Sequence, residues 1–232
     1  MQENRILIGI PVRDRAHILP EVLDAIARQV YNLKWISIYF YTNDNIDDTV
    51  MVLARFADRF SHFFESIKIE IEDRGVPRDH RMASWRKGHA GMLAHAYNKC
   101  IEAAVQAKVP YLYLMDSDEV PPEDALVRFV ADMENPTISI VGGLVYHEKT
   151  GYVNVFDSTR RMLKRETIPF NETPIVAYIC GSKLIRMAHL GDVRFNADGE
   201  NMGYDLDFID KVAKNQPCIR LNSGIQIKHF QA

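Results

Sequence analysis

Strand-like and helix-like segments alternate through the first half of the chain, and this order limits the folds open to it. Short apolar, β-branched or aromatic runs predict strands at residues 5–12, 35–42, 66–73 and 111–116. Apolar residues at helical spacing predict helices at residues 17–30, 47–60 and 92–105. Strands that alternate with helices in this way form a parallel sheet with helices on both faces. The sequence therefore predicts an α/β fold with three layers, α/β/α, around a mostly parallel central sheet.

The second half of the chain is less regular. Strands are predicted at residues 137–147, 151–158 and 218–230, a strand followed by a short helix at 175–191, and a helix at 204–216. Two basic stretches, 74–91 and 159–173, show no clean period and are predicted to be loops. Asp47 or Asp48 is expected to cap the helix at 47–60.

The size and composition are those of one globular domain, or at most two small ones. The 232 residues are 47% hydrophobic and 25% charged with a net charge of -3, which argues against a disordered protein and against a nucleic-acid partner. No apolar run reaches the length of a membrane span, and the chain opens directly into a strand, so no signal peptide is expected. The cysteines are odd in number and far apart, which predicts reduced core residues of a cytoplasmic protein; they are Cys100, Cys180 and Cys218.

The predicted strand at 111–116 ends in a run of acids, Asp116-Ser117-Asp118-Glu119, followed by two prolines. Ligands of open α/β sheets bind beyond the carboxyl ends of the strands, which is where these acids lie. If the strand stays extended, Asp116 and Asp118 point the same way, and if the chain turns at Ser117, both can reach one ion. Carboxylates this close repel each other unless a cation neutralises them, and Mg²⁺ or Mn²⁺ is the natural partner. The alternative is that the acids only stabilise the N-terminus of a helix that the prolines begin.

Four blocks of the sequence, taken in order, resemble glycosyltransferases of the GT-A fold, close to glycosyltransferase family 2. Residues 6–31 resemble the opening strand, Pro-Val turn and first helix of that family, and residues 39–49 its second strand and acidic turn. Residues 91–126 resemble its helix and Asp-x-Asp strand, and residues 203–230 its late acidic helix and closing strand with a histidine. The resemblance implies one GT-A catalytic domain over 1–232, in which 1–120 binds the nucleotide-sugar and 121–232 the acceptor.

The resemblance also assigns residues to the nucleotide. Pro11, Val12 and Arg13 would line the base and ribose. Thr42, Asn43 and Asp44 would contact the base at the end of the second strand. The first aspartate of the family's turn aligns with Thr42 or Asn43, a departure that bears on which base is bound. A UDP-sugar is the expected donor and a GDP-sugar the second choice.

The acids take the metal and diphosphate in this family. Asp116 would hold the ribose or the ion, and Asp118 the ion and the diphosphate. His229 would be the third metal-side ligand, and Ser117 is grouped with the donor-binding residues. The implied cofactor is Mn²⁺ or Mg²⁺. Without the resemblance, His229 reads as an ordinary surface residue at the end of a strand.

The implied reaction is displacement at the anomeric carbon of the sugar by a glycan or another hydroxyl acceptor. The metal stabilises charge on the leaving diphosphate, and a carboxylate deprotonates the acceptor. Asp205 matches the family's base, although Tyr204 stands where glutamate is usual. A base on the far side of the sugar predicts inversion of configuration. The alternative is that Asp205 and Asp207 are solvated charges on a helix.

Other functions fit the sequence less well. A nucleotidyltransferase would usually open with a Gly-rich signature and a lysine after the first strand, and neither is present. A haloacid-type phosphatase needs its Asp-x-Asp near the first strand. A GT-A-like module that binds a nucleotide or glycan without turnover remains the non-enzymatic alternative. The basic loops 74–89 and 159–173 would contact the diphosphate, an anionic acceptor or, peripherally, a membrane surface. Because the chain is short for a dedicated acceptor domain, a partner or a homo-oligomer would complete the acceptor site.

Overall fold

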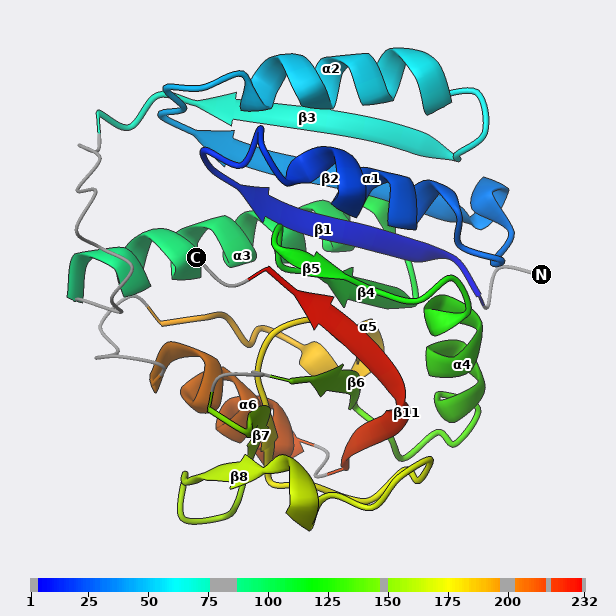
Figure 1. Ribbon diagram of the computed structural model, residues 1–232, viewed down its shortest axis with the longest axis vertical. Coiled ribbons are helices and arrows are strands. Elements are labelled where there is room, and N and C mark those ends of the chain that lie inside the picture. Colours follow the sequence, from blue (N-terminus) through cyan, green and yellow to red (C-terminus); the bar gives the residue numbers. More distant parts are fainter. Residues whose placement is uncertain (1–3, 76–86, 147–149, 197–202, 216–217, 231–232) are drawn as a thin grey trace.

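The computed structural model describes residues 4–75, 87–146, 150–196, 203–215 and 218–230. Within these residues, the core is an eight-stranded sheet with the strand order β3-β2-β1-β4-β10-β6-β11-β5 (Figure 1). In that order, the strands span Ser66–Glu72, Ile36–Asn43, Ile6–Val12, Tyr111–Leu114, Lys183–Arg186, Ile140–Val145, Ile219–His229 and Glu119–Val120.

The register of the sheet brings several strand ends to one edge. β1 is parallel to both β2 and β4, and β2 is parallel to β3. Val12 lies opposite Thr42, so the loops after β1 and β2 emerge side by side. β10 runs antiparallel to β4 and β6, while β11 is parallel to β6, which makes the sheet mixed. Residues that precede or follow these strands therefore converge at the carboxyl edge of β1, β2 and β4.

Helices cover both faces of the sheet (Figure 1). One face packs against α1 (Leu19–Ala27), α2 (Thr49–Phe60) and α4 (Ala125–Asp132). The other packs against α3 (Lys87–Ala107), α5 (Met187–Leu190) and α6 (Gly203–Asn215). Strand side chains alternate between faces, so Ile6 joins the first core and Leu7 the second. The predicted three-layer α/β fold is confirmed.

A second, three-stranded sheet extends the core on the side of α6. Its order is β8 (Met162–Lys164), β7 (Tyr152–Phe156) and β9 (Tyr178–Ile179). Buried side chains of β7 and β9 join the same hydrophobic cluster as α3 and α6. Short 3-10 helices lie at Leu33–Trp35 (η1) and Arg165–Thr167 (η2). The predicted loop at 159–173 was therefore wrong in part, because it contains β8 and η2.

The other differences from prediction are short strands and the ends of elements; residues 175–191 hold two strands, β9 and β10, where one was predicted. α3 begins at Lys87, so the predicted loop 74–91 was wrong for its last residues, and 76–86 lie outside the described residues. β5 was not predicted, because two residues carry no period. Asp48 occupies the N-cap position of α2 without a capping side-chain bond, whereas Asp47 Oδ1 accepts the Thr49 N–H at 3.0 Å. In the part of the chain that the structure describes, no helix is long and apolar enough to cross a membrane.

Candidate active site

The acids after β4 form a tight turn, which we call the acid turn, residues 116–119. The Glu119 N–H donates to the Asp116 carbonyl at 3.3 Å, so the chain turns at Ser117, which is one of the two conformations that the sequence left open. The turn is fixed against the last strand, because Glu119 pairs with His229 and the Phe230 N–H donates to the Asp118 carbonyl at 2.8 Å. Asp118 and His229 are thereby brought close together, and Asp116 lies two residues before Asp118 in the same turn.

Asp116 is held from two sides. The Tyr97 hydroxyl, on α3, donates to its Oδ1, and the Asp116 N–H donates to Ser182 Oγ at 3.2 Å. Burial and the neighbouring charge of Asp118 raise the pKa of Asp116 to about 6, against the opposing hydrogen bond from Tyr97. Burial is the larger of these two effects, and the charge of Asp118 adds to it.

Asp118 faces a cation and the imidazole. Its Oδ2 lies 3.2 Å from Arg15 Nη2, and its Oδ1 lies 3.8 Å from His229 Nε2. Arg15 belongs to the loop after β1, so this ion pair ties the acid turn to the neighbouring strand end. Among the described residues, no group of three or more histidine, cysteine or acidic side chains is arranged to hold a metal ion.

Glu119 is the most deeply buried acid of the turn, at 3% exposure. Its Oε2 accepts the Ser182 N–H at 3.0 Å, and burial together with the charge of Asp116 raises its pKa well above the ordinary value. Gly181 packs directly against this carboxyl, since a Cβ at Gly181 would lie 2.5 Å from Glu119 Oε1. The segment before β10 is thus built around the acid turn.

Asp205 lies in the first turn of α6 and is 5% exposed. Its Oδ1 lies 2.9 Å from Nζ of Lys183, which is the first residue of β10 and 2% exposed. Lys183 Nζ also donates to the Gly181 carbonyl at 2.8 Å. Desolvation is the largest single effect and disfavours the ammonium, but the neighbouring groups Asp205, Cys180 and Asp116 together outweigh it, so the pKa of Lys183 is raised. Asp205 is therefore not the solvated helix charge of the alternative interpretation.

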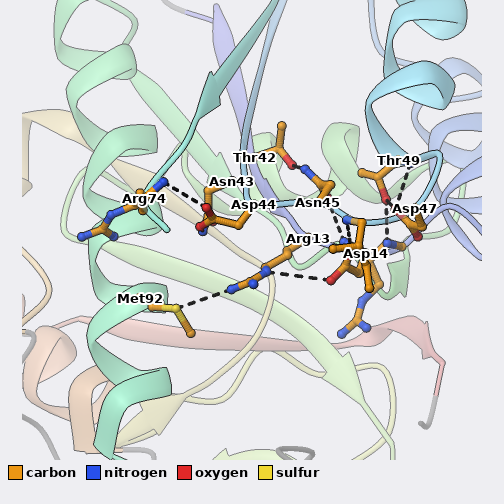
Figure 2. Close-up of polar contacts among 12 residues, drawn as sticks. Arg13, Asp14, Thr42, Asn43, Asp44, Asn45, Asp47, Thr49, Arg74 and Met92 are labelled. Carbon is orange, nitrogen blue, oxygen red and sulfur yellow. Dashed lines mark hydrogen bonds and ion pairs between the residues drawn. The ribbon is translucent and has the colours of Figure 1, made fainter. Parts of the chain in front are cut away.

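The loops after β1 and β2 are joined by hydrogen bonds (Figure 2). Asp14 donates its N–H to Asn45 Oδ1 at 2.9 Å and accepts the Ile46 N–H at 2.8 Å. Asn45 Nδ2 in turn donates to Thr42 Oγ1 at 2.5 Å. Asp14 has a left-handed φ of 52°, a conformation that aspartate tolerates better than most residues. The two loops therefore form one connected rim at the carboxyl edge.

The residues predicted for the base and ribose fall into two groups. The first group is buried at the ends of β1 and β2 and consists of Pro11, Val12 and Thr42. These side chains expose little surface to a ligand. Arg13 is partly exposed, and its Nη1 lies 3.6 Å from Met92 Sδ on α3 (Figure 2). These side chains lie on the same rim as the loop that carries Arg15.

Asn43 and Asp44 lie at the end of β2, next to the end of β3. Asn43 is buried and donates its Nδ2 hydrogen to Asp44 Oδ2 at 2.7 Å. Asp44 Oδ1 accepts the backbone N–H groups of Arg74 and Gly75 at 3.0 and 2.9 Å (Figure 2). Asp44 thus holds the start of the connection that leads toward α3.

Several residues of the site were missed by the sequence reasoning. Tyr97 was counted only as part of an apolar helical stripe, and Arg15 and Ser182 carried no pattern at all. Lys183 did carry a signal, because a lysine within the apolar run of a central strand needs a buried partner. Glu119 was noted as an acid, but its burial followed from β5, which was not predicted.

The basic stretch at 159–173 is partly neutralised. Arg160 Nη2 lies 2.9 Å from Asp207 and 2.5 Å from Asp210, both on α6, and its guanidinium lies over the Tyr178 ring. Phe170 is 61% exposed, with the Arg165 guanidinium 5.9 Å from its ring centre. The Arg160 guanidinium therefore binds carboxylates of α6 in this structure, which leaves it less available to bind an anionic acceptor.

Comparison with known proteins gives a family and a fold. A family model described as "Glycosyltransferase family 25, N-terminal domain" matches residues 3–156. TarS from S. aureus superposes with a TM-score of 0.67 at 14% identity, covering 98% of this chain and 37% of that chain. Mannosyltransferase PcManGT from Pyrobaculum calidifontis, in complex with GDP-Man and Mn²⁺, gives 0.67 at 15% identity, covering 97% and 56%. GalNAc-T7 with UDP, GalNAc and Mn²⁺ gives 0.66 at 11% identity, covering 98% and 44%.

These neighbours confirm the GT-A fold that the four sequence blocks suggested. Because the sequence identities are this low, the structural matches establish the fold alone. The chain also spans only 37% to 56% of the lengths of these neighbours. TarS is also known in complexes with UDP and with UDP-GlcNAc. No curated protein matches the chain.

Proposed function

Since the chain belongs to the family of glycosyltransferase family 25 N-terminal domains, we propose that it transfers a sugar from a nucleoside diphosphate donor to an acceptor hydroxyl. The observation that carries the proposal is the acid turn, which places Asp116 and Asp118 at the carboxyl edge of the sheet, against the final strand. The edge of an open α/β sheet is where such ligands bind. The proposal covers residues 1–232 as one catalytic domain, with the donor half in 1–120 and the acceptor half in 121–232.

The donor would lie along the rim of the two loops after β1 and β2. Pro11, Val12 and Arg13 on one side, with Thr42, Asn43 and Asp44 on the other, would hold the base and ribose. The Arg13 guanidinium is partly exposed at this rim and can stack on or donate to a nucleotide. Complexes of the structural neighbours with UDP, UDP-GlcNAc and GDP-Man support a UDP-sugar first and a GDP-sugar second.

A divalent cation fits the chemistry of the acid turn. Asp116 and Asp118 would supply oxygens and His229 an imidazole nitrogen, and Mn²⁺ accepts both donor types. Burial first and the charge of Asp118 second raise the pKa of Asp116, and a cation would offset both effects. Asp118 would exchange its contact with Arg15 for the ion. When bound, the cation would stabilise the negative charge that develops on the diphosphate.

Asp205 would act as the base. The acceptor oxygen bonds to the anomeric carbon, the bond from that carbon to the diphosphate breaks with its electron pair, and the acceptor proton passes to the carboxylate. A base opposite the leaving group gives inversion. Proton NMR of the fresh product measures the anomeric configuration, and retention of the donor's configuration would rule this geometry out.

The acceptor is proposed as a glycan or another hydroxyl compound, bound by the second half of the chain. The exposed Phe170 on the loop after η2 offers a surface on which a sugar ring can stack. A cytoplasmic location, with peripheral contact to a membrane, and a homo-oligomer that completes the acceptor site are further parts of the proposal.

A thermal-shift panel tests the proposed donor site. UDP, GDP, dTDP and their sugars are each added with and without Mn²⁺, because a ligand of the folded state raises the melting temperature by mass action. We expect one nucleotide to raise it only with Mn²⁺, and D118N to remove that rise. D58N, an exposed aspartate on α2, is the matched control and keeps the rise. A rise that D118N leaves intact places the site elsewhere.

A nucleotide-binding module without turnover is the second candidate. It is favoured by one observation, the engagement of Asp205 by Lys183. The two candidates separate on donor cleavage, since a module binds the donor and leaves it intact.

A further inference from the structure

We propose that Lys183 is a positioning residue that holds Asp205 as an ionised base at the acid turn. This inference rests on the proposed function, since it assigns a task to Lys183 in the same reaction. The family resemblance of the sequence assigned the base role to Asp205 and gave Lys183 no role.

The sheet register brings Lys183 to the site. It lies opposite Leu114, the last residue of β4, and opposite Gly142 of β6. β10 therefore starts where β4 gives way to the acid turn. Ser182, its neighbour, contacts both Asp116 and Glu119 through side chain and backbone. A lysine at this position reaches the first turn of α6 from the floor of the site.

The contact is specific and nearly dry. Lys183 Nζ lies 2.9 Å from Asp205 Oδ1 and donates to the Gly181 carbonyl at 2.8 Å, so the ammonium has two fixed acceptors. The two side chains are 3% and 8% exposed. The bond to the Gly181 carbonyl fixes the position of the ammonium, and the ammonium in turn orients the Asp205 carboxylate. A general base needs such a fixed orientation to come within hydrogen-bond distance of the acceptor hydroxyl.

Stability alone is a poor reason for such a pair. Desolvation of two charges offsets most of their attraction, so apolar residues of similar volume often serve a fold as well. A buried general base, in contrast, needs a neighbouring cation such as the Lys183 ammonium to stay ionised. Burial favours the neutral form of a carboxyl, and an adjacent ammonium favours the charged form, which is the form that accepts a proton.

Other groups around the ammonium agree with this arrangement. Asp205 faces it from α6, Cys180 from the segment before β10, and Asp116 from the turn after β4, and each raises the pKa of Lys183. Asp205 and Asp116 therefore both favour the charged form of Lys183. Its charge reaches both halves of the proposed site.

Donor cleavage in the wild type, K183M and D205N tests the proposal. The probes are UDP-GlcNAc and GDP-mannose with Mn²⁺, with water as acceptor and release of the nucleoside diphosphate as readout. Loss of a general base costs about 10²- to 10⁴-fold in kcat. We expect the kcat of K183M to fall by at least about 10-fold, but by no more than the loss of the base itself, with the donor KM unchanged. The double variant K183M/D205N is expected to be no slower than D205N.

The pH profile separates positioning from mere structure. In K183M the acid limb of kcat moves to higher pH, because the buried carboxylate has lost its cation. K68M is the matched control, since Lys68 is an exposed lysine paired with Glu70 at 3.2 Å, and its kcat and profile stay unchanged. An unmoved acid limb in K183M, or multiplicative losses in the double variant, overturns the proposal.

If the wild type neither binds nor cleaves either donor, the proposed function is wrong. Melting temperatures then test separately whether Lys183 holds Asp205 in its ionised form. At pH 8 K183M is expected to melt below the wild type, because it leaves a buried carboxylate unpaired. D205N introduced into K183M removes that charge and raises the melting temperature again. K183M that melts with the wild type, or a double variant no more stable than K183M, shows that the pair does not hold an ionised Asp205.

Discussion

Gly181 makes the construction of the acid turn directly testable. It has a left-handed φ of +76°, and a Cβ there would lie 2.5 Å from Glu119 Oε1. Gly151 has nearly the same backbone, with φ of +72°, and nothing within 4 Å of an added Cβ. The pair G181A and G151A therefore shares the backbone strain and differs in the steric contact with the buried carboxyl.

The expected losses follow from these contacts. An alanine forced into a left-handed conformation costs about 1–2 kcal/mol, which both variants bear. G181A must also displace Glu119 from the Ser182 N–H, and a buried polar group left unsatisfied costs about 1–3 kcal/mol. G181A should thus lose about 2–5 kcal/mol of unfolding free energy, and G151A about 1–2 kcal/mol.

Urea unfolding measures both variants against the wild type. A shift of the midpoint at constant slope reports a change in stability rather than a change in the unfolded chain. The reasoning is refuted if G181A and G151A lose the same free energy within about 0.5 kcal/mol, the precision at which independent sites add. Equal losses would mean that Glu119 does not pack against Gly181 as described.

Three further predictions concern the charges around the site. R15M frees Asp118 from an ion pair worth at most about 1 kcal/mol, so Mn²⁺ should bind up to about fivefold more tightly by calorimetry, and weaker binding contradicts the assignment of Asp118. In metal-free protein, the raised pKa of Asp116, about 6 against 3.8, means that the folded state binds the proton more tightly, so its contribution to stability falls as pH rises from about 4 to about 6. D116N should flatten that decline in urea midpoints taken across the range, and an unchanged slope argues against it. R160A removes exposed contacts to two carboxylates of α6 and should cost under about 1 kcal/mol, so a larger loss gives Arg160 a greater part in holding α6.

Much of the fold could be predicted because its signals are local. The continuous apolar runs of β1, β2 and β4 and the amphipathic stripes of α1 and α2 each lie within a dozen residues. β5 and β10 were harder, since β5 has two residues and the direction of β10 depends on the path of the chain between distant segments. The start of α3 was masked by a basic composition that has no helical period.

The candidate site shows the same division. Asp116 and Asp118 are visible in sequence as acids that follow a buried strand, but the sequence left open whether the chain stays extended or turns at Ser117. The pairing of Lys183 with Asp205 joins residues 22 positions apart in different elements, and the contact of Tyr97 with Asp116 depends on how α3 lies on the sheet. Such partners are set by tertiary packing, which no local pattern records.

The most direct test of the central claim is whether the protein cleaves a nucleotide-sugar at the acid turn. Phosphorus NMR of UDP-GlcNAc and GDP-mannose with Mn²⁺ follows the sugar diphosphate and the nucleoside diphosphate as separate signals. The account predicts conversion of one donor by the wild type and by D58N, and none above background by D116N or D118N. Conversion that persists in both acid-turn variants, or an intact donor despite binding, would contradict it.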